Sequence, residues 1–242
     1  MPPPKPAPET VLITINHAAQ KPARLFLTTM KILLEENTPW LKSGETLVCF
    51  GDSLTHAQPG YVSILQEKLG TKGINVINAG LGGDKTLTAL TRIRPDVIDR
   101  KPTAVSIFFG ANDGVIGRGV WADEPMLSPN TYKEALIWII HLCRIWGGVS
   151  KFSIIIPPMT GEGKGFYEFC MAYAPYARAA REAADMAGAI IVPMDAVLAH
   201  ERMKRGYIFD KDQLCLTKDG LHMTQEGYAL VAETALKAWH LD

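Results

Sequence analysis

From residue 46 onward, short runs of β-branched and aromatic residues alternate with longer segments that have helical periodicity. Such alternation is typical of βαβ units, in which helices cover both faces of a parallel sheet. The expected strands cover residues 46–50, 75–78, 103–109, 152–156 and 189–192. Five strands joined by helical crossovers predict an α/β fold, a three-layer α/β/α sandwich with a doubly wound, five-stranded parallel sheet.

The segments between these strands, and the segment after the last one, carry the helical patterns. The expected helices cover residues 61–69, 86–100, 132–146, 167–186 and 224–239. Proline lacks the backbone N–H that a helix interior needs, so Pro95 should kink or split the second helix and Pro175 should interrupt the fourth. The third helix has an apolar stripe, formed by Leu136, Ile139, Ile140 and Cys143.

The first 45 residues stand outside this alternation. Residues 11–15 have strand character and residues 25–36 have helical character. We expect residues 1–45 to be an N-terminal extension, packed on the domain or at a subunit contact, and residues 46–242 to form one domain. The Pro-rich N-terminus has no apolar stretch of signal-peptide length, and the apolar runs elsewhere are too short to span a bilayer.

Charge and cysteine usage narrow the class of protein. Twenty-five Lys and Arg balance twenty-five Asp and Glu, so no net charge draws the chain to nucleic acid or to an anionic membrane. An apolar content of 47% is too high for a disordered chain. The four cysteines contain no CxxC pair, which argues against a zinc ribbon and a disulfide framework and predicts reduced thiols in a cytoplasmic protein. They are Cys49, Cys143, Cys170 and Cys215.

Ligands of open parallel sheets bind beyond the carboxyl ends of the strands, so the loops after the first three strands are the place to seek chemistry. After the first strand comes Ser53, in a Gly-Asp-Ser turn that suits a nucleophile but that, taken alone, more often caps the next helix. The glycine-rich loop 78–86 fits neither the P-loop nor the dinucleotide pattern, because Asp84 and Lys85 stand where glycines are needed. Gly83 then remains as a candidate N–H donor.

Two further loops supply polar side chains. Asn112 follows the third strand and could provide a neutral amide donor, although an Asn-Asp pair is also a common turn. Asp219 and His222 lie three residues apart before the last helix, close enough for the carboxylate to hold one ring nitrogen. The remaining carboxylates of these loops, Asp52, Asp84 and Asp113, are expected to fix the loop backbone.

With these blocks in place, the sequence resembles the SGNH, or GDSL-type, hydrolases. It carries their four blocks in order: GDSLT at 51–55, NxGxxG at 78–83, GxND at 110–113 and DxxH at 219–222. The likeness covers roughly residues 46–240, and four ordered motifs are far more specific than any one of them. The wording FFGAND and DGLHMT is most similar to the branch that contains isoamyl-acetate-type esterases. No GxSxG motif occurs, so an α/β-hydrolase is not indicated.

The resemblance implies a flavodoxin-like sheet bearing an esterase site. Ser53 would be the nucleophile, His222 the general base and then acid, and Asp219 the group that orients His222. The backbone N–H groups of Ser53 and Gly83, with the Asn112 side chain, would form the oxyanion hole. The expected reaction is hydrolysis of carboxylic esters with small or medium acyl groups, acetyl among them, through an acyl-enzyme and without a metal or organic cofactor.

Several alternatives stay open at this point. The same residues would serve a carbohydrate O-deacetylase, a thioesterase or lysophospholipase, or an acyltransferase, and a non-catalytic ligand-binding domain could share the fold. The long loop 114–130, with Trp121 and Met126, either covers an apolar acyl pocket or packs as surface structure. His56 either lines the alcohol side of the site or caps its helix in solvent. A small-molecule ester is the expected partner, and self-association is left open.

Overall fold

The computed structural model describes residues 38–114, 126–158, 162, 167–206 and 213–242. Contacts within the chain separate two units, Met1–Pro39 and Trp40–Asp242, and the following description concerns the second. The strand and helix expected at 11–15 and 25–36 lie outside the described residues. The limits expected for the extension and the domain, 1–45 and 46–242, stay a prediction.

The sheet has five parallel strands in the order β2-β1-β3-β4-β5. The order reverses direction at β1, which is the switch point of a doubly wound sheet, and the predicted three-layer, flavodoxin-like fold is confirmed. The strands are β1 Thr46–Gly51, β2 Asn75–Gly80, β3 Ala104–Phe108, β4 Lys151–Ile155 and β5 Ile190–Val192. Each lies within three residues of its expected limits.

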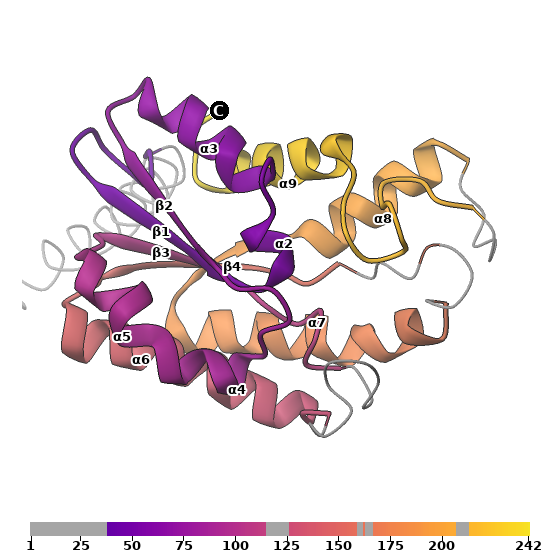
Figure 1. The fold of residues 1–242 in the computed structure, drawn as a ribbon, viewed down its shortest axis with the longest axis horizontal. Coiled ribbons are helices and arrows are strands. Elements are labelled where there is room, and N and C mark those ends of the chain that lie inside the picture. The colour runs from indigo at the N-terminus through magenta and orange to yellow at the C-terminus, as the bar shows by residue number, and fades with distance from the viewer. Residues whose placement is uncertain (1–37, 115–125, 159–161, 163–166, 207–212) are drawn as a thin grey trace, which may run out of the picture. The chain divides into compact units, whose positions relative to one another are not determined.

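Helices cover both faces of this sheet (Figure 1). One face carries α3 (Tyr61–Gly70), α8 (Met194–Lys204) and α9 (Gln225–Ala238), whose side chains share one apolar core. The other face carries α4, α5, α6 and α7, which enclose the second core. Their bounds are α4 Thr86–Ala89, α5 Ile93–Asp96, α6 Pro129–Gly147 and α7 Tyr167–Ala187.

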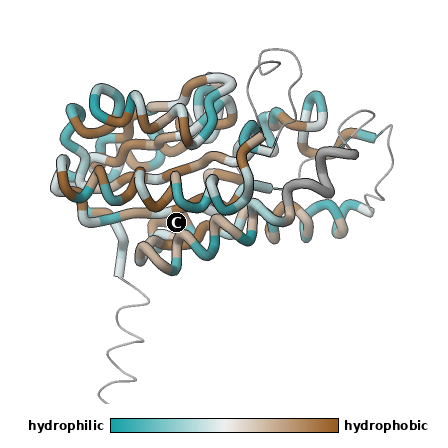
Figure 2. Tube along the Cα trace, turned by 90° about the horizontal axis from the view of Figure 1, so that it is seen from below, coloured by the Kyte–Doolittle hydropathy of each residue, from teal (hydrophilic) through white to brown (hydrophobic). Residues whose placement is uncertain are grey.

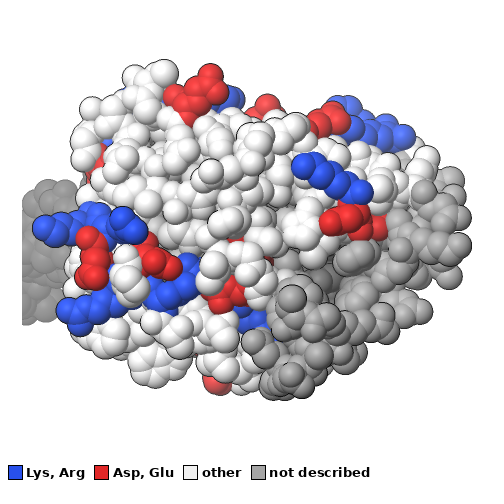
Figure 3. All heavy atoms as spheres, in the orientation of Figure 1, with Lys and Arg blue, Asp and Glu red and all other residues white. Residues whose placement is uncertain are grey.

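Because the sheet is covered by apolar cores on both faces, its strands consist mostly of apolar residues. Along β1, Leu47 and Cys49 enter the core beneath α3 and α9, while Val48 and Phe50 enter the core beneath α5 and α6. All four side chains are fully buried, as expected for a parallel strand covered on both faces. Along the helices apolar and polar residues alternate with the turns (Figure 2). Charges of both signs are interspersed on the face shown in Figure 3.

Two expected helices differ from the structure. Residues 86–100 form four short pieces, because the 3-10 segments Leu90–Arg92 and Ile98–Arg100 flank α5, so the predicted split is present but begins before Pro95. The predicted interruption at Pro175 is wrong, because α7 runs through it without a break. Losing one backbone hydrogen bond at Pro175 costs less free energy than exposing the apolar residues of the following helical turns, where Ala180 and Ala183 are fully buried.

Candidate active site

The turn after β1 places Ser53 at the carboxyl end of the sheet (Figure 1). Ser53 is the first residue of the one-turn helix α2 (Ser53–His56), and Asp52 caps it, with Oδ1 accepting from the backbone N–H of Leu54 at 2.9 Å. Gly51 is needed here because a Cβ would lie 2.5 Å from the carbonyl oxygen of Phe108. The Gly-Asp-Ser sequence therefore fixes where the Ser53 hydroxyl lies.

The end of β2 is tied to the same helix. Asn78 donates from Nδ2 to the carbonyl of Thr55 at 2.8 Å, and its Oδ1 accepts from the backbone N–H of Gly80 at 2.9 Å. Gly83, the expected donor, has a φ of +78°, which a side chain would strain. It is half-buried, in the loop that follows β2 directly.

Asn112, in the loop after β3, reaches across to the β2 loop. Its side chain is buried, and Nδ2 donates to the carbonyl of Asp84 at 2.9 Å. An amide NH₂ has two hydrogens, so this bond orients the group and leaves the second hydrogen for a ligand atom. The structure thus joins the β2 and β3 loops through the residue that the sequence singled out.

The loop before α9 brings His222 to Ser53. The ring atom Nε2 lies 3.1 Å from Ser53 Oγ, and Nδ1 lies 2.7 Å from Asp219 Oδ2. A carboxylate only accepts, so Nδ1 carries the hydrogen and Nε2 is the acceptor that faces the Ser53 hydroxyl. Against the effect of its partial burial, the hydrogen bonds from His222 and Leu221 hold the pKa of Asp219 below its ordinary value. Asp219 is therefore charged at neutral pH.

Backbone bonds shape the loop that carries this pair. Asp219 Oδ1 accepts from the backbone N–H groups of Leu221 and His222, at 3.0 and 2.7 Å. Gly220 between them has a φ of +93°, and Thr217 pairs with Met223 as an antiparallel bridge. These local bonds close the loop into a turn and orient the Asp219 carboxylate and the His222 imidazole.

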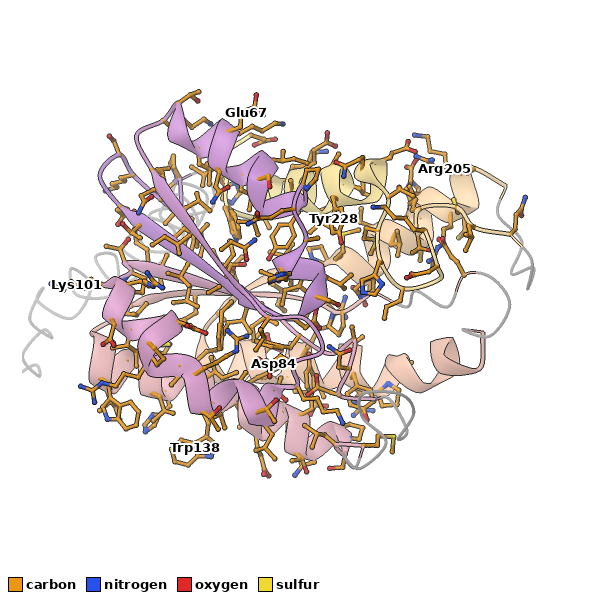
Figure 4. The ribbon with its side chains drawn as sticks, viewed as in Figure 1. Glu67, Asp84, Lys101, Trp138, Arg205 and Tyr228 are labelled. Atoms are coloured by element: carbon orange, nitrogen blue, oxygen red, sulfur yellow. The ribbon has the colours of Figure 1, made fainter. Side chains whose placement is uncertain are left out.

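Of the other three carboxylates, Asp52 and Asp113 accept from loop backbone N–H groups, as expected, whereas Asp84 accepts from side chains. Asp113 Oδ1 accepts from both the N–H and the hydroxyl of Thr86, and Asp84 accepts from Thr88 and Arg92. Figure 4 shows Asp84 near the carboxyl ends of the strands. Burial raises the pKa of Asp52 to about 8, helped by the charges of Asp113 and Asp84 and opposed by the bond from Leu54.

Arg92 is a contributor that the sequence gave no reason to expect. Its guanidinium donates to the carbonyls of Gly51 and Ala79, at 3.0 and 2.9 Å, and to the carboxylate of Asp84 at 2.6 Å. It also lies over the ring of Phe50, 4.4 Å from the centroid. One side chain thereby joins the ends of β1 and β2 to the β2 loop. No short motif marks such a residue, because apart from Asp96, four positions on, its hydrogen-bond partners are 8 to 41 positions away in the chain.

The structure describes two of the three residues expected with lower priority, His56 and Met126. His56 is exposed at the end of α2, and its Nδ1 lies 2.9 Å from the carbonyl of Gly80. Its role on the alcohol side of the site stays a prediction. Met126 is 46% exposed. Trp121, with residues 115–125, lies outside the described part of the chain, so the acyl-pocket prediction stays a prediction.

The described residues bear on whether the chain holds a metal ion or a membrane span. They contain no group of three or more His, Cys, Asp or Glu side chains placed to hold a metal ion. None of the helices in the described ranges combines the length and the apolar character needed to cross a bilayer.

The geometry agrees with a match to known proteins. The model of the GDSL-like lipase/acylhydrolase family matches residues 49–230. The chain belongs to this family. The match begins within β1 and ends within α9, so it includes every loop of the candidate site. The resemblance found in the four sequence blocks is confirmed.

Among curated relatives, the chain is 33% identical to the uncharacterized lipoprotein YqeF of Bacillus subtilis over 50% of its length and 52% of that protein. It is 34% identical to the esterase TesA of Pseudomonas aeruginosa over 49% of its length and 59% of that protein. It therefore spans little more than half of these two proteins. An acetylxylan esterase of Geobacillus stearothermophilus is 26% identical over 81% of this chain and 94% of that enzyme.

Solved structures show the same fold. A catalytic mutant of Axe2, an acetylxylan esterase from Geobacillus stearothermophilus, superposes with a TM-score of 0.69. The superposition covers 82% of this chain and 95% of that structure, at 22% identity. The likeness extends over nearly the whole of that protein, and it supports the fold rather than a substrate.

Proposed function

We propose that this chain is a serine esterase that hydrolyses carboxylic esters through an acyl-enzyme on Ser53. One observation carries the proposal: the series from Ser53 Oγ to His222 Nε2 at 3.1 Å, and from His222 Nδ1 to Asp219 Oδ2 at 2.7 Å. A hydroxyl, an imidazole and a carboxylate in this order form the general arrangement of nucleophilic acyl transfer. Membership of the lipase/acylhydrolase family supports the same reaction.

In the proposed mechanism His222 takes the hydroxyl proton of Ser53 as Oγ attacks the ester carbonyl carbon. The backbone N–H groups of Ser53 and Gly83 and the amide of Asn112 stabilise the negative oxygen of the tetrahedral intermediate. His222 then gives its proton to the departing alcohol. Water repeats the sequence on the acyl-enzyme, and the acid and free Ser53 are released. Asp219 keeps Nδ1 protonated and stabilises the imidazolium that forms in each half-reaction.

A covalent probe and a chromogenic ester test the reaction. We expect the purified chain to hydrolyse p-nitrophenyl acetate and to be labelled by a fluorophosphonate at Ser53, as located by peptide mass spectrometry. Ser53→Ala should lose both, whereas Ser63→Ala, a partly buried serine in α3, should keep both. A wild-type chain that is folded but neither turns over the ester nor reacts with the probe would refute the proposal.

Acetyl groups on carbohydrates are the substrate class that we propose first. The support is the 26% identity to an acetylxylan esterase over 94% of that enzyme. Hydrolysis of acyl thioesters or lysophospholipids and acyl transfer to an alcohol would use the same catalytic residues, so the shape of the substrate pocket determines which reaction is favoured. A panel of acetylated xylo-oligosaccharides, p-nitrophenyl esters of increasing length and acyl-CoA separates these alternatives. A higher kcat/KM for long acyl chains than for acetylated sugars would contradict the carbohydrate assignment.

A further inference from the structure

Glu162, in the connection between β4 and α7, is a carboxylate with no exposed surface. It accepts hydrogen bonds from the backbone N–H groups of Cys215, Leu216 and Thr217, at 2.9, 3.1 and 2.9 Å. The hydroxyl of Thr217 donates to it as well, at 2.5 Å. All of these donors belong to the segment that leads into the Asp219–His222 turn.

Arg202 of α8 completes the surroundings of Glu162. Its Nε donates to Oε1 at 2.7 Å, and its side chain is only 4% exposed. A buried ion is stable only when it is paired and hydrogen-bonded, and both oxygens of Glu162 meet that condition. Burial alone would raise its pKa, yet the bonds from Thr217 and Cys215 and the charge of Arg202 hold the pKa below its ordinary value. Glu162 is thus charged, and its two oxygens accept the hydrogen bonds of Arg202 and of the 215–217 segment.

Thr217 connects Glu162 to the Asp219–His222 turn. Its hydroxyl gives its hydrogen to Glu162, and the same oxygen accepts from the backbone N–H of Gly220 at 3.1 Å. The backbone N–H of Lys218 donates to the carbonyl of His222 at 2.7 Å. Two hydrogen bonds in series therefore connect Glu162 to the backbone of Gly220, between Asp219 and His222, and the bond from Lys218 to His222 closes the turn.

The acid–base pair itself has little packing to hold it. The side chains of Asp219 and His222 are 50% and 42% exposed. Their orientation therefore depends on the backbone beneath them. Arg205, at the end of α8, donates to the carboxylate of Glu226 at the start of α9 and so connects these two helices.

We propose that Glu162 is a positioning residue, which holds the Asp219–His222 turn against Ser53 through Thr217 and is itself held by Arg202. This inference rests on the proposed esterase function and extends it to a carboxylate that touches neither substrate nor the reacting atoms. A displacement of the imidazole by about 1 Å can reduce turnover by roughly two orders of magnitude.

Two variants break the connection at different points. Glu162→Gln keeps the length of the side chain but turns an NH₂ group toward donors. Thr217→Val removes only the hydroxyl that bridges Glu162 and Gly220, so it is the milder change, and Thr217→Ser restores the hydroxyl. Asp195→Asn is the matched control, because it removes another carboxylate–guanidinium pair of α8, with Arg181, that has no contact with the turn.

The measurements are kcat and KM for p-nitrophenyl acetate, well below each melting temperature, and the proton resonance of His222 Nδ1. We expect kcat to fall about 10- to 100-fold in Glu162→Gln and Thr217→Val, with KM changed less than about threefold. The Nδ1 resonance, far downfield in the wild type because the hydrogen lies in a bond to a carboxylate, should move upfield or broaden. Thr217→Ser should recover kcat, and Asp195→Asn should leave both readouts unchanged.

The outcomes separate a positioning role from a purely structural one. If the two variants are folded and keep wild-type kcat and the wild-type resonance, Glu162 only stabilises the fold and the inference fails. An equal loss of kcat in Asp195→Asn would also refute it. A wild-type chain without esterase activity would refute the proposed function instead. The resonance would then still decide whether Glu162 orients His222.

Discussion

Asn112 is the side chain that we propose as an oxyanion donor, and its removal tests this proposal directly. We expect Asn112→Ala to lower kcat for an activated ester about 10²–10³-fold, the usual cost of losing one oxyanion donor, with a much smaller change in KM. Steady-state kinetics with p-nitrophenyl acetate would measure both. Unchanged kcat in a folded variant would remove Asn112 from the oxyanion hole.

The same substitution also removes the bond to the carbonyl of Asp84. A single lost hydrogen bond of this kind costs about 1 kcal/mol of folding free energy. Urea unfolding of Asn112→Ala therefore serves as the control: a small loss of stability with a large loss of kcat assigns the effect to chemistry.

Asp52 gives a pH dependence of stability. Its pKa is raised from 3.8 to about 8, so the folded chain keeps a proton that the unfolded chain releases above about pH 4. Unfolding then releases protons, and the free energy of unfolding falls as pH rises from about 4 to 8, by up to about 1.4 kcal/mol per unit for one proton. Asp113, whose pKa burial raises to about 6, acts in the same direction at lower pH.

Asp52→Asn should flatten this dependence. Asparagine stays neutral, and it also caps helices well, so the bond from Leu54 can persist. We expect the plot of unfolding free energy against pH, measured with urea between pH 5 and 8, to be less steep for the variant than for the wild type. Parallel plots would show that Asp52 titrates normally in the folded chain.

Among the helices, α7 carries a defined cost at Pro175. Proline in an exposed helix interior is about 3 kcal/mol less favourable than alanine, while its restriction of the unfolded chain returns about 0.4–1 kcal/mol. Since α7 already accommodates the ring, part of the cost is relieved, and Pro175→Ala should raise the free energy of unfolding by about 1 to 2 kcal/mol. Urea unfolding would measure it, and a loss of stability would contradict the reasoning.

The elements also show what sequence patterns can predict. The strands were predictable because a strand buried on both faces needs an apolar run. Ser53 was predictable because its motif follows the end of a strand, and His222 because it lies three residues after Asp219, just before the last helix. Helix α8 was not predictable, since of its three buried residues only Met194 and Leu198 are apolar and the third, Arg202, is charged. Glu162 and Arg92 were missed because their partners lie far away in the chain, and only the folded structure brings them together.

At the scale of the whole domain, the residues before β1 close the core from the amino end. The backbone N–H of Trp40 donates to the carbonyl of Trp239 at 2.9 Å, and the two rings are 5.1 Å apart. Leu41 is only 2% exposed, and Glu45 pairs with Lys151 at the start of β4. The candidate active site lies at the opposite, carboxyl end of the strands.

Truncation tests whether these residues belong to the folding unit. A chain of residues 46–242 lacks Trp40, Leu41 and Glu45, and we expect it to be less stable than residues 40–242 by about 3 to 5 kcal/mol, from lost apolar burial. For a domain of this size, that lowers the melting temperature by about 10 °C. Both chains should be labelled by the fluorophosphonate at low temperature, because the site is remote. Equal melting temperatures would place the start of the folding unit at residue 46. A lower melting temperature for Trp40→Ala in the chain of residues 40–242 would assign part of the loss to the contact of Trp40 with Trp239.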